Sequence, residues 1–72
     1  MTGNELLRKL KRLARRKDVA FEFDPRAGKG GHGQIIFGDQ TTTLRSSRPK
    51  EIPPGTLRKM LSDLGVDPQD LH

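Results

Sequence analysis

The sequence predicts a small α+β domain with element order α-β-β-β-α, in which a three-stranded antiparallel sheet carries two helices on one face. Three observations predict this fold class. Apolar residues recur at helical spacing near both ends of the chain, they alternate with polar residues in the middle, and glycine or proline separates these segments. Two amphipathic helices and one half-buried sheet bury their apolar sides most economically as two layers. The 72 residues are expected to form one domain, residues 1–72, without repeat or linker.

The first helix is expected to begin at Thr2, because Thr2 and Glu5 have the spacing of a capping box. Its apolar stripe recurs at three- and four-residue spacing and consists of Leu6, Leu7, Leu10, Leu13 and Ala14. The rest of its circumference is basic. Arg15, Arg16 and Lys17 fall in the last turn, where the helix dipole favours positive charge, so part of this cluster is interpreted as structural.

Three strands are expected to follow. Residues 19–24 alternate with a period of two, which predicts a half-buried strand ending at Pro25. The apolar run 35–37 predicts a second strand, and residues 40–45, rich in β-branched side chains, predict a third. The Gly-Asp pair at 38–39 predicts the tight turn of a hairpin between them.

The second helix is expected after a polar crossover loop at residues 46–53. Residues 53–54, both proline, favour its first turn. Its apolar stripe consists of Leu57, Met60, Leu61 and Leu64. Gly65 predicts the C-terminal stop, with Val66 as a hydrophobic contact at the cap. The tail after it is short and polar, and the terminal His72 is expected to be frayed.

Composition narrows the classes of function. The formal net charge of +5 favours a polyanionic partner, and nucleic acid is the first candidate, although many small proteins are basic for solubility alone. The 17 Leu, Ile, Val and Phe residues suffice for one modest core, so any active site must be open and shallow. The chain has no cysteine for a disulfide or a thiolate zinc site. It also lacks an apolar signal segment and a span of about 20 apolar residues, which predicts a cytosolic location away from membranes.

A glycine-rich loop at residues 26–31 leads directly into His32. RNA carries its own nucleophile, the 2′-hydroxyl, so its cleavage needs a proton-transfer group and cations beside the phosphate, but no metal. Histidine, with an ordinary pKa of about 6.5, suits the proton step. We hypothesise that His32 acts as general acid or base while Lys29 and Arg26 neutralise the scissile phosphate. The alternative is that His32 only bonds a backbone carbonyl at the start of a strand and the glycines only make a turn.

Two other kinds of site are disfavoured. The glycine-rich loop is followed by a strand and not by a helix, so it lacks the helix N-terminus of a nucleotide-binding loop. Asp18, Glu22 and Asp24 have neither a metal-ligand nor a paired-acid spacing. No metal and no cofactor are therefore expected.

Further cations are expected to follow a phosphate backbone, and these are Arg45, Arg48, Lys50, Arg58 and Lys59. The alternative is an ordinary solvated surface. All three Phe occupy apolar strand positions, and the chain has no Tyr or Trp. Recognition of the backbone or of RNA shape is therefore favoured over base stacking.

The element order, the histidine after a glycine-rich loop and the segment 55–61 (GTLRKML) together resemble the HicA, or YcfA-like, toxins of bacterial toxin–antitoxin systems. The resemblance covers residues 4–65. It implies a fold similar to double-stranded-RNA-binding domains, a ribonuclease activity on mRNA, His32 as the catalytic histidine and a HicB-like antitoxin as partner. In that family a Gly and a small polar residue precede the histidine, whereas Gly30 and Gly31 precede it here.

Three functions remain open. The first is a metal-independent endoribonuclease toxin (an mRNA interferase), whose cationic face around His32 an acidic antitoxin would cover. The second is a catalytically silent RNA-binding module, which Gly31 supports because it offers no hydroxyl beside the histidine. The third, DNA binding in a regulatory role, is disfavoured because a sheet separates the two helices and no helix-turn-helix can form.

Overall fold

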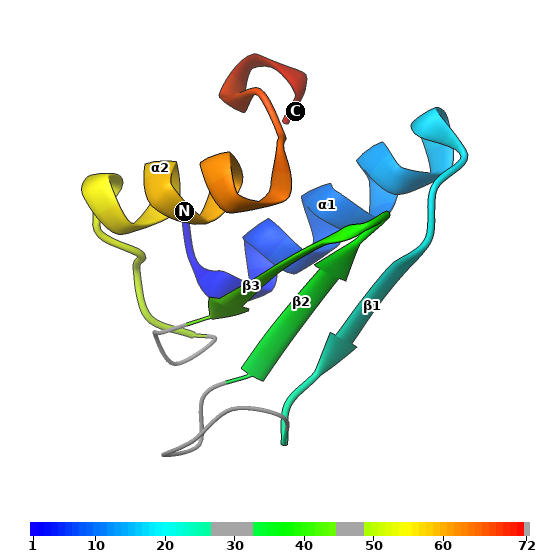
Figure 1. Cartoon of the computed structure of the whole chain (residues 1–72). Coiled ribbons are helices and arrows are strands. Elements are labelled where there is room, and N and C mark those ends of the chain that lie inside the picture. The colour runs from blue at the N-terminus through cyan, green and yellow to red at the C-terminus, as the bar shows by residue number, and fades with distance from the viewer. Residues whose placement is uncertain (27–32, 45–48, 72) are drawn as a thin grey trace.

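Two helices lie over one face of a three-stranded antiparallel sheet, in the order α-β-β-β-α (Figure 1). The structure, a computed structural model, describes residues 1–26, 33–44 and 49–71. Its elements are α1 (Gly3–Lys17), β1 (Phe21–Asp24), β2 (Gly33–Phe37), β3 (Gln40–Leu44), α2 (Pro54–Leu64) and a 3₁₀ helix (Pro68–Asp70). The predicted fold class is therefore confirmed.

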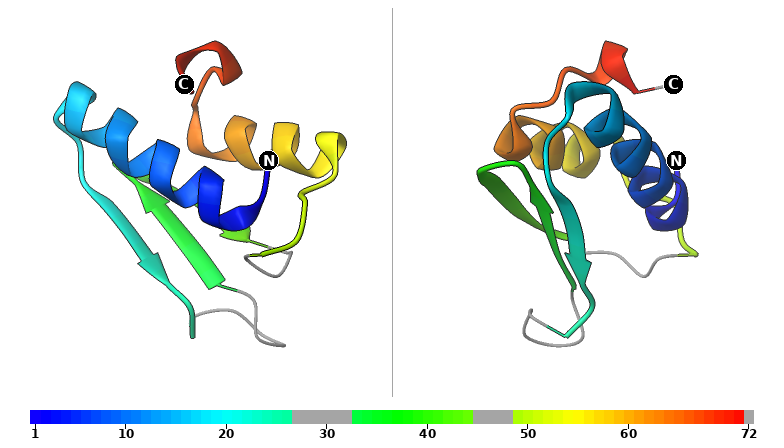
Figure 2. Two further views of the ribbon diagram at one scale, coloured as in Figure 1. Left: turned by 180° about the vertical axis from the view of Figure 1, so that it is seen from behind. Right: turned by 90° about the vertical axis from the view of Figure 1, so that its right-hand side faces the viewer.

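The sheet has β2 at its centre, antiparallel to β1 on one side and to β3 on the other. Ile35 is the partner of Phe23 in β1 and of Thr42 in β3, so these three side chains share the face beneath the helices. Figure 2 shows both helices on that side. The largest fully buried side chains come from both helices and from the sheet. They are Leu6, Leu10, Ile35, Leu44 and Leu61. One core therefore unites both helices with the sheet.

Helix α1 begins with the predicted capping box. The Thr2 hydroxyl accepts from the Glu5 backbone N–H at 3.2 Å, and the Thr2 backbone N–H donates to the Glu5 carboxylate at 3.0 Å. The helix ends at Asp18, which has the left-handed φ of 56°. Val19 N–H then donates to Ala14 O at 3.0 Å, closing the helix end.

This helix end corrects the predicted start of the first strand. Alternation suggested a strand from residue 19, with Val19 on its buried side. Instead β1 begins at Phe21, and Val19 is 38% exposed. The backbone N–H of Val19 belongs to the helix cap, so this residue is not free to join the sheet ladder.

Acid is expected to weaken the start of α1 through Glu5. The backbone N–H of Thr2, and secondly its hydroxyl, hold the pKa of Glu5 below its ordinary value of 4.5. Because the folded-state pKa is the lower one, the stabilisation is fully present above about pH 4.5 and is lost as the pH falls through the folded value. Glu5→Gln keeps a capping side chain but does not titrate. In urea titrations we expect wild type to be the more stable at neutral pH and the two proteins to converge in acid; a constant difference would contradict this.

The β2–β3 hairpin turns at Gly38 and Asp39, as predicted. Gly38 has a φ of 60°, which favours glycine at the first loop position, and its N–H donates to Ala20 O at 2.8 Å. At the centre of β3, the buried Thr42 hydroxyl donates to Asp63 in α2 at 3.0 Å. This bond adds a polar link to the apolar contact between β3 and α2.

The crossover and the tail contribute more to the core than their polar composition predicted. Ile52 is 3% exposed, and its N–H donates to Met1 O at 2.9 Å. After α2, Gly65 caps the helix with a φ of 68° and Val66 is buried, both as predicted. The tail then forms a 3₁₀ helix over α1, and Leu71 packs against the core. His72 lies outside the described residues.

Neither helix of the described residues has the length and hydrophobicity that a membrane span requires.

Candidate nucleic-acid interface

The structure describes the residues on either side of segment 27–32 but not the segment itself. His32 and Lys29, the predicted catalytic and phosphate-neutralising residues, lie in 27–32, outside the described residues. Gly33, the residue directly after His32, opens the central strand β2 and is buried opposite Leu44. The histidine is thus followed immediately in sequence by an anchored strand.

Gly33 is required where the ring of Phe23 crosses the start of β2. A Cβ added to Gly33 would lie 2.4 Å from Cε1 and Cζ of Phe23 and 3.2 Å from the Asp24 carbonyl oxygen. Phe23 is itself packed against the core. Position 33 therefore needs glycine because the Phe23 ring packs against it. The glycine-rich sequence around it did not predict this packing role.

Arg26 lies at the same end of the sheet as Gly33, since Asp24 is the β1 partner of Gln34. The Arg26 backbone N–H donates to Asp24 Oδ1 at 2.9 Å, which makes an Asx turn after Pro25. The arginine is exposed. Arg26 therefore lies at the end of the sheet where the glycine-rich segment connects β1 to β2, and its role beside a phosphate stays a prediction.

Of the three cations predicted to contact a phosphate backbone between β3 and α2, the structure describes Lys50. The other two, Arg45 and Arg48, fall within 45–48, outside the described residues. Lys50 is exposed in a bend. The next residue, Glu51, forms a bridge with Thr2 and an ion pair with the N-terminal amine. Lys50 is thereby held near the start of α1.

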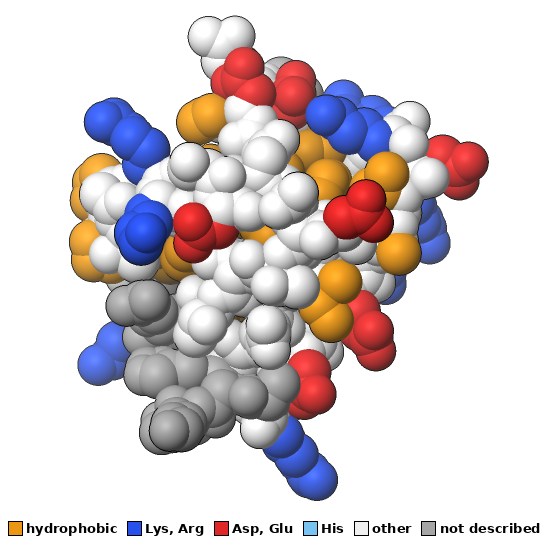
Figure 3. Space-filling view, viewed as in Figure 1, with side chains coloured by type: hydrophobic (Ala, Val, Ile, Leu, Met, Phe, Trp, Pro, Cys, Tyr) orange, Lys and Arg blue, Asp and Glu red, His pale blue; other side chains and the backbone are white. Residues whose placement is uncertain are grey.

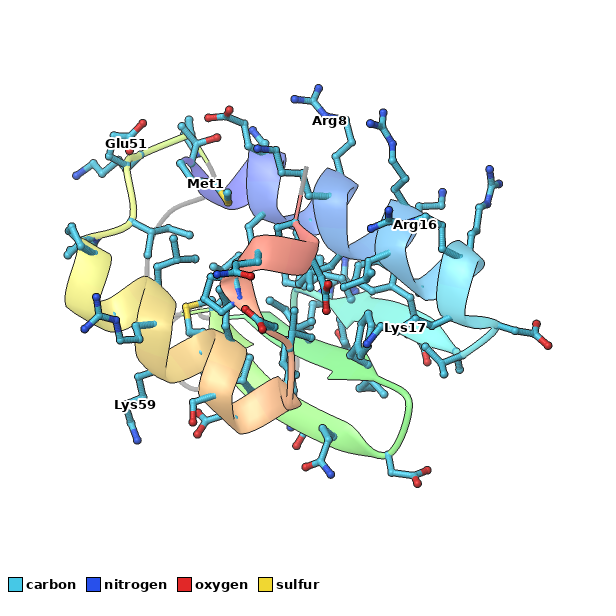
Figure 4. All side chains as sticks on the ribbon, turned by 90° about the horizontal axis from the view of Figure 1, so that it is seen from above. Met1, Arg8, Arg16, Lys17, Glu51 and Lys59 are labelled. Atoms are coloured by element: carbon cyan, nitrogen blue, oxygen red, sulfur yellow. The ribbon has the colours of Figure 1, made fainter. Side chains whose placement is uncertain are left out.

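Arg58 and Lys59 are exposed on α2, a different part of the chain from the described cations Arg26 and Lys50. Arg58 borders a shallow, largely apolar hollow with Leu57 and Pro68. Figure 4 shows Lys59 on the side of the molecule opposite Arg8. Of the predicted contacts that are described, only Arg26 lies beside the glycine-rich segment.

The open face of the sheet is poor in positive charge. In Figure 3 Lys and Arg side chains lie towards the margins of this face, while acidic and uncharged groups occupy its middle. Glu22 and Asp24 alternate with the core-facing Phe21 and Phe23 and are exposed. Within residues 1–26, 33–44 and 49–71, no three His, Asp or Glu side chains gather to hold a metal ion. The described part of this face therefore offers little positive charge to a polyanion.

Within the described residues, a concentrated positive surface lies on the outer side of α1, which was expected to be basic but was not predicted to belong to the site. Four exposed side chains surround a shallow hollow of about 240 Å³ there: Arg8, Lys11, Arg12 and Arg15. We call these four residues the α1 basic face. Their i, i+3, i+4, i+7 spacing is legible in the sequence and is the signal that could have identified them.

No family model, curated protein or solved structure matches this chain. Its function is therefore inferred from its own residues and fold.

Proposed function

We propose that this protein is the toxin of a toxin–antitoxin pair, a metal-independent endoribonuclease that cleaves mRNA in the cytoplasm and is neutralised by a HicB-like antitoxin. The observation that carries the proposal is the α-β-β-β-α fold with β2 opening directly after His32. This is the fold that the resemblance to HicA toxins implied, and His32 directly precedes β2 in the sequence, which supports the proposal.

The chemistry follows from one histidine and nearby cations. His32 moves a proton to or from the reacting oxygens as the 2′-hydroxyl attacks the adjacent phosphate. Lys29 and Arg26 stabilise the charge that grows on that phosphate. With one central histidine and no acid–base pair, turnover is slow.

The alternative is a catalytically silent RNA-binding module. Gly31 favours it, because no hydroxyl stands next to His32 in the sequence. This protein would keep the fold and the cationic surface and lack the cleavage step.

Controlled expression in a bacterial host separates the two. Wild type is expected to arrest growth with loss of full-length mRNA, and His32→Ala is expected to do neither, because it lacks the proton-transfer group. Growth and mRNA integrity are followed in the same cultures, and circular dichroism of the purified proteins confirms that both fold. Harmless expression of folded wild type would reject the toxin and favour the silent module.

A further inference from the structure

Half of the chain's positive charge is on one helix. Seven of the 14 Lys and Arg residues belong to α1, and these are Arg8, Lys9, Lys11, Arg12, Arg15, Arg16 and Lys17. Six of them form two groups with different surroundings, and Lys9 belongs to neither. Two cations contact the tail, and four form the α1 basic face.

The cations at the end of α1 contact the tail. Arg16 donates to the Asp70 carbonyl oxygen at 2.8 Å, and Lys17 Nζ lies 3.8 Å from the Asp70 carboxylate. Figure 4 shows the two labelled side chains beside the tail. Positive charge here is partly neutralised and has a structural use.

The α1 basic face has no such use. Among the residues that the structure describes, no carboxylate lies within ion-pair distance of Arg8, Lys11, Arg12 or Arg15. At about 100° per residue, the four project within an arc of about 100° opposite the buried stripe. They extend over about 10 Å of the helix axis. Four like charges are thus concentrated in two turns, which raises the local electrostatic cost of the free protein.

Charge of this density is suited to a phosphate chain. Arginine presents donors in a planar fork that matches phosphate oxygens, and three of these four residues are arginine. The hollow between them is open and shallow, so a backbone can lie across it. Among the described residues, the opposite, open face of the sheet carries Glu22 and Asp24, and this difference in charge would orient an approaching polyanion towards α1.

A folded protein partner fits this surface less well. Stable protein interfaces have an apolar or aromatic centre inside a polar rim. Within the described residues, Val19 is the one large apolar side chain that is exposed, and it lies beyond the end of α1. The α1 basic face therefore has the composition of a backbone contact and lacks the anchors of a protein interface.

We infer that the α1 basic face binds the phosphate backbone of RNA, as a contact separate from the segment that contains His32. The choice of RNA as the polyanion rests on the proposed function. The contact is with phosphates, so it contributes affinity and orientation without reading sequence. This contact lies on α1, whereas the further phosphate contacts predicted from the sequence lie on α2 and between β3 and α2.

Salt dependence of binding provides the test. The triple variant Arg8→Gln, Arg12→Gln, Arg15→Gln is compared with Lys9→Gln, Arg16→Gln, Lys17→Gln, which removes the same charge from the same helix outside the hollow. Glutamine has nearly the helix propensity of both residues it replaces, so α1 is retained. All proteins carry His32→Ala to prevent cleavage, and circular dichroism verifies their fold. The probe is a short single-stranded oligoribonucleotide, and polyglutamate serves as an acidic polypeptide.

Each phosphate contact on single-stranded nucleic acid changes the slope of log affinity against log salt by about 0.7. The first triple variant should therefore lose about two units of slope. Between about 50 and 200 mM salt, parent affinity should fall about 20-fold more than affinity of this variant. The matched triple variant should stay close to the parent. An unchanged slope in the first variant, equal losses in both variants, or a loss of polyglutamate binding with RNA binding intact would overturn the inference.

Cleavage by the chain with His32 intact, measured in parallel at low salt, distinguishes the two proposals. RNA cleavage together with an unchanged slope would reject this surface and leave the ribonuclease standing. The predicted change in slope without any cleavage would support the surface and reject the ribonuclease.

Discussion

Replacing His32 by alanine is expected to slow RNA cleavage by the purified protein by about 10²–10⁴-fold, the acceleration that one positioned acid–base group contributes. The measurement is the initial rate of cleavage of a labelled oligoribonucleotide in the presence of a chelator, since the mechanism requires no metal. His72→Ala is the matched control because His72 is the chain's second histidine. It should retain the wild-type rate.

The nucleophile is tested on the substrate. A single 2′-deoxy substitution at the cleaved position should abolish cleavage by wild type at that position, because the attacking hydroxyl is gone. Continued cleavage of this substrate would mean that water or a protein group attacks the phosphate. A wild-type rate for His32→Ala would remove the histidine from the mechanism.

Gly33→Ala is expected to destabilise the domain by about 1–3 kcal/mol, the usual cost of forcing a methyl group into a packed site. The added Cβ would lie 2.4 Å from the ring of Phe23, so the ring or the start of β2 must move. For a domain of this size, such a loss is a large part of the free energy of unfolding, which averages about 0.05–0.15 kcal/mol per residue. The free energy of unfolding is measured in urea.

Gly55→Ala is the matched control, since nothing lies within 4 Å of a Cβ at that helical position. It should be neutral or stabilising by up to about 1 kcal/mol. A double-mutant cycle assigns the cause: in a Phe23→Leu background, Gly33→Ala should cost less, because the ring atoms that it meets are absent. An equal cost in both backgrounds would show that the Phe23 ring is not the obstacle.

The same substitution links packing to the proposed site. Gly33 follows His32 directly, so a shift of the β2 start displaces the segment that contains the histidine. At a temperature where Gly33→Ala remains folded, RNA cleavage should still fall below the wild-type rate, whereas cleavage by Gly55→Ala should not.

The candidate site was predictable from sequence only in part. A histidine after consecutive glycines is a local pattern, and His32, Lys29 and Arg26 could be named from it. Which of the other Lys and Arg side chains form one surface depends on how the helices and strands pack together. Arg58 and Lys59 were predicted to join the backbone contacts, yet they lie away from the α1 basic face on a different helix. The row at Arg8, Lys11, Arg12 and Arg15 had a visible period but was described only as part of the basic circumference of the first helix.

The sequence by itself determined the two helices, the three strands and several of their caps, although not the residue at which β1 begins. Thr2 with Glu5, Gly38 and Gly65 act on neighbours within a few residues, so the bonds that they make are implied by short spacings. Tertiary structure alone decided the contacts between distant residues, such as Ile52 with Met1 and Asp70 with Arg16. It also decided which cations of α1 contact the tail. Local patterns fix backbone conformation, whereas the partner of a side chain depends on how the helices and the tail lie over the sheet.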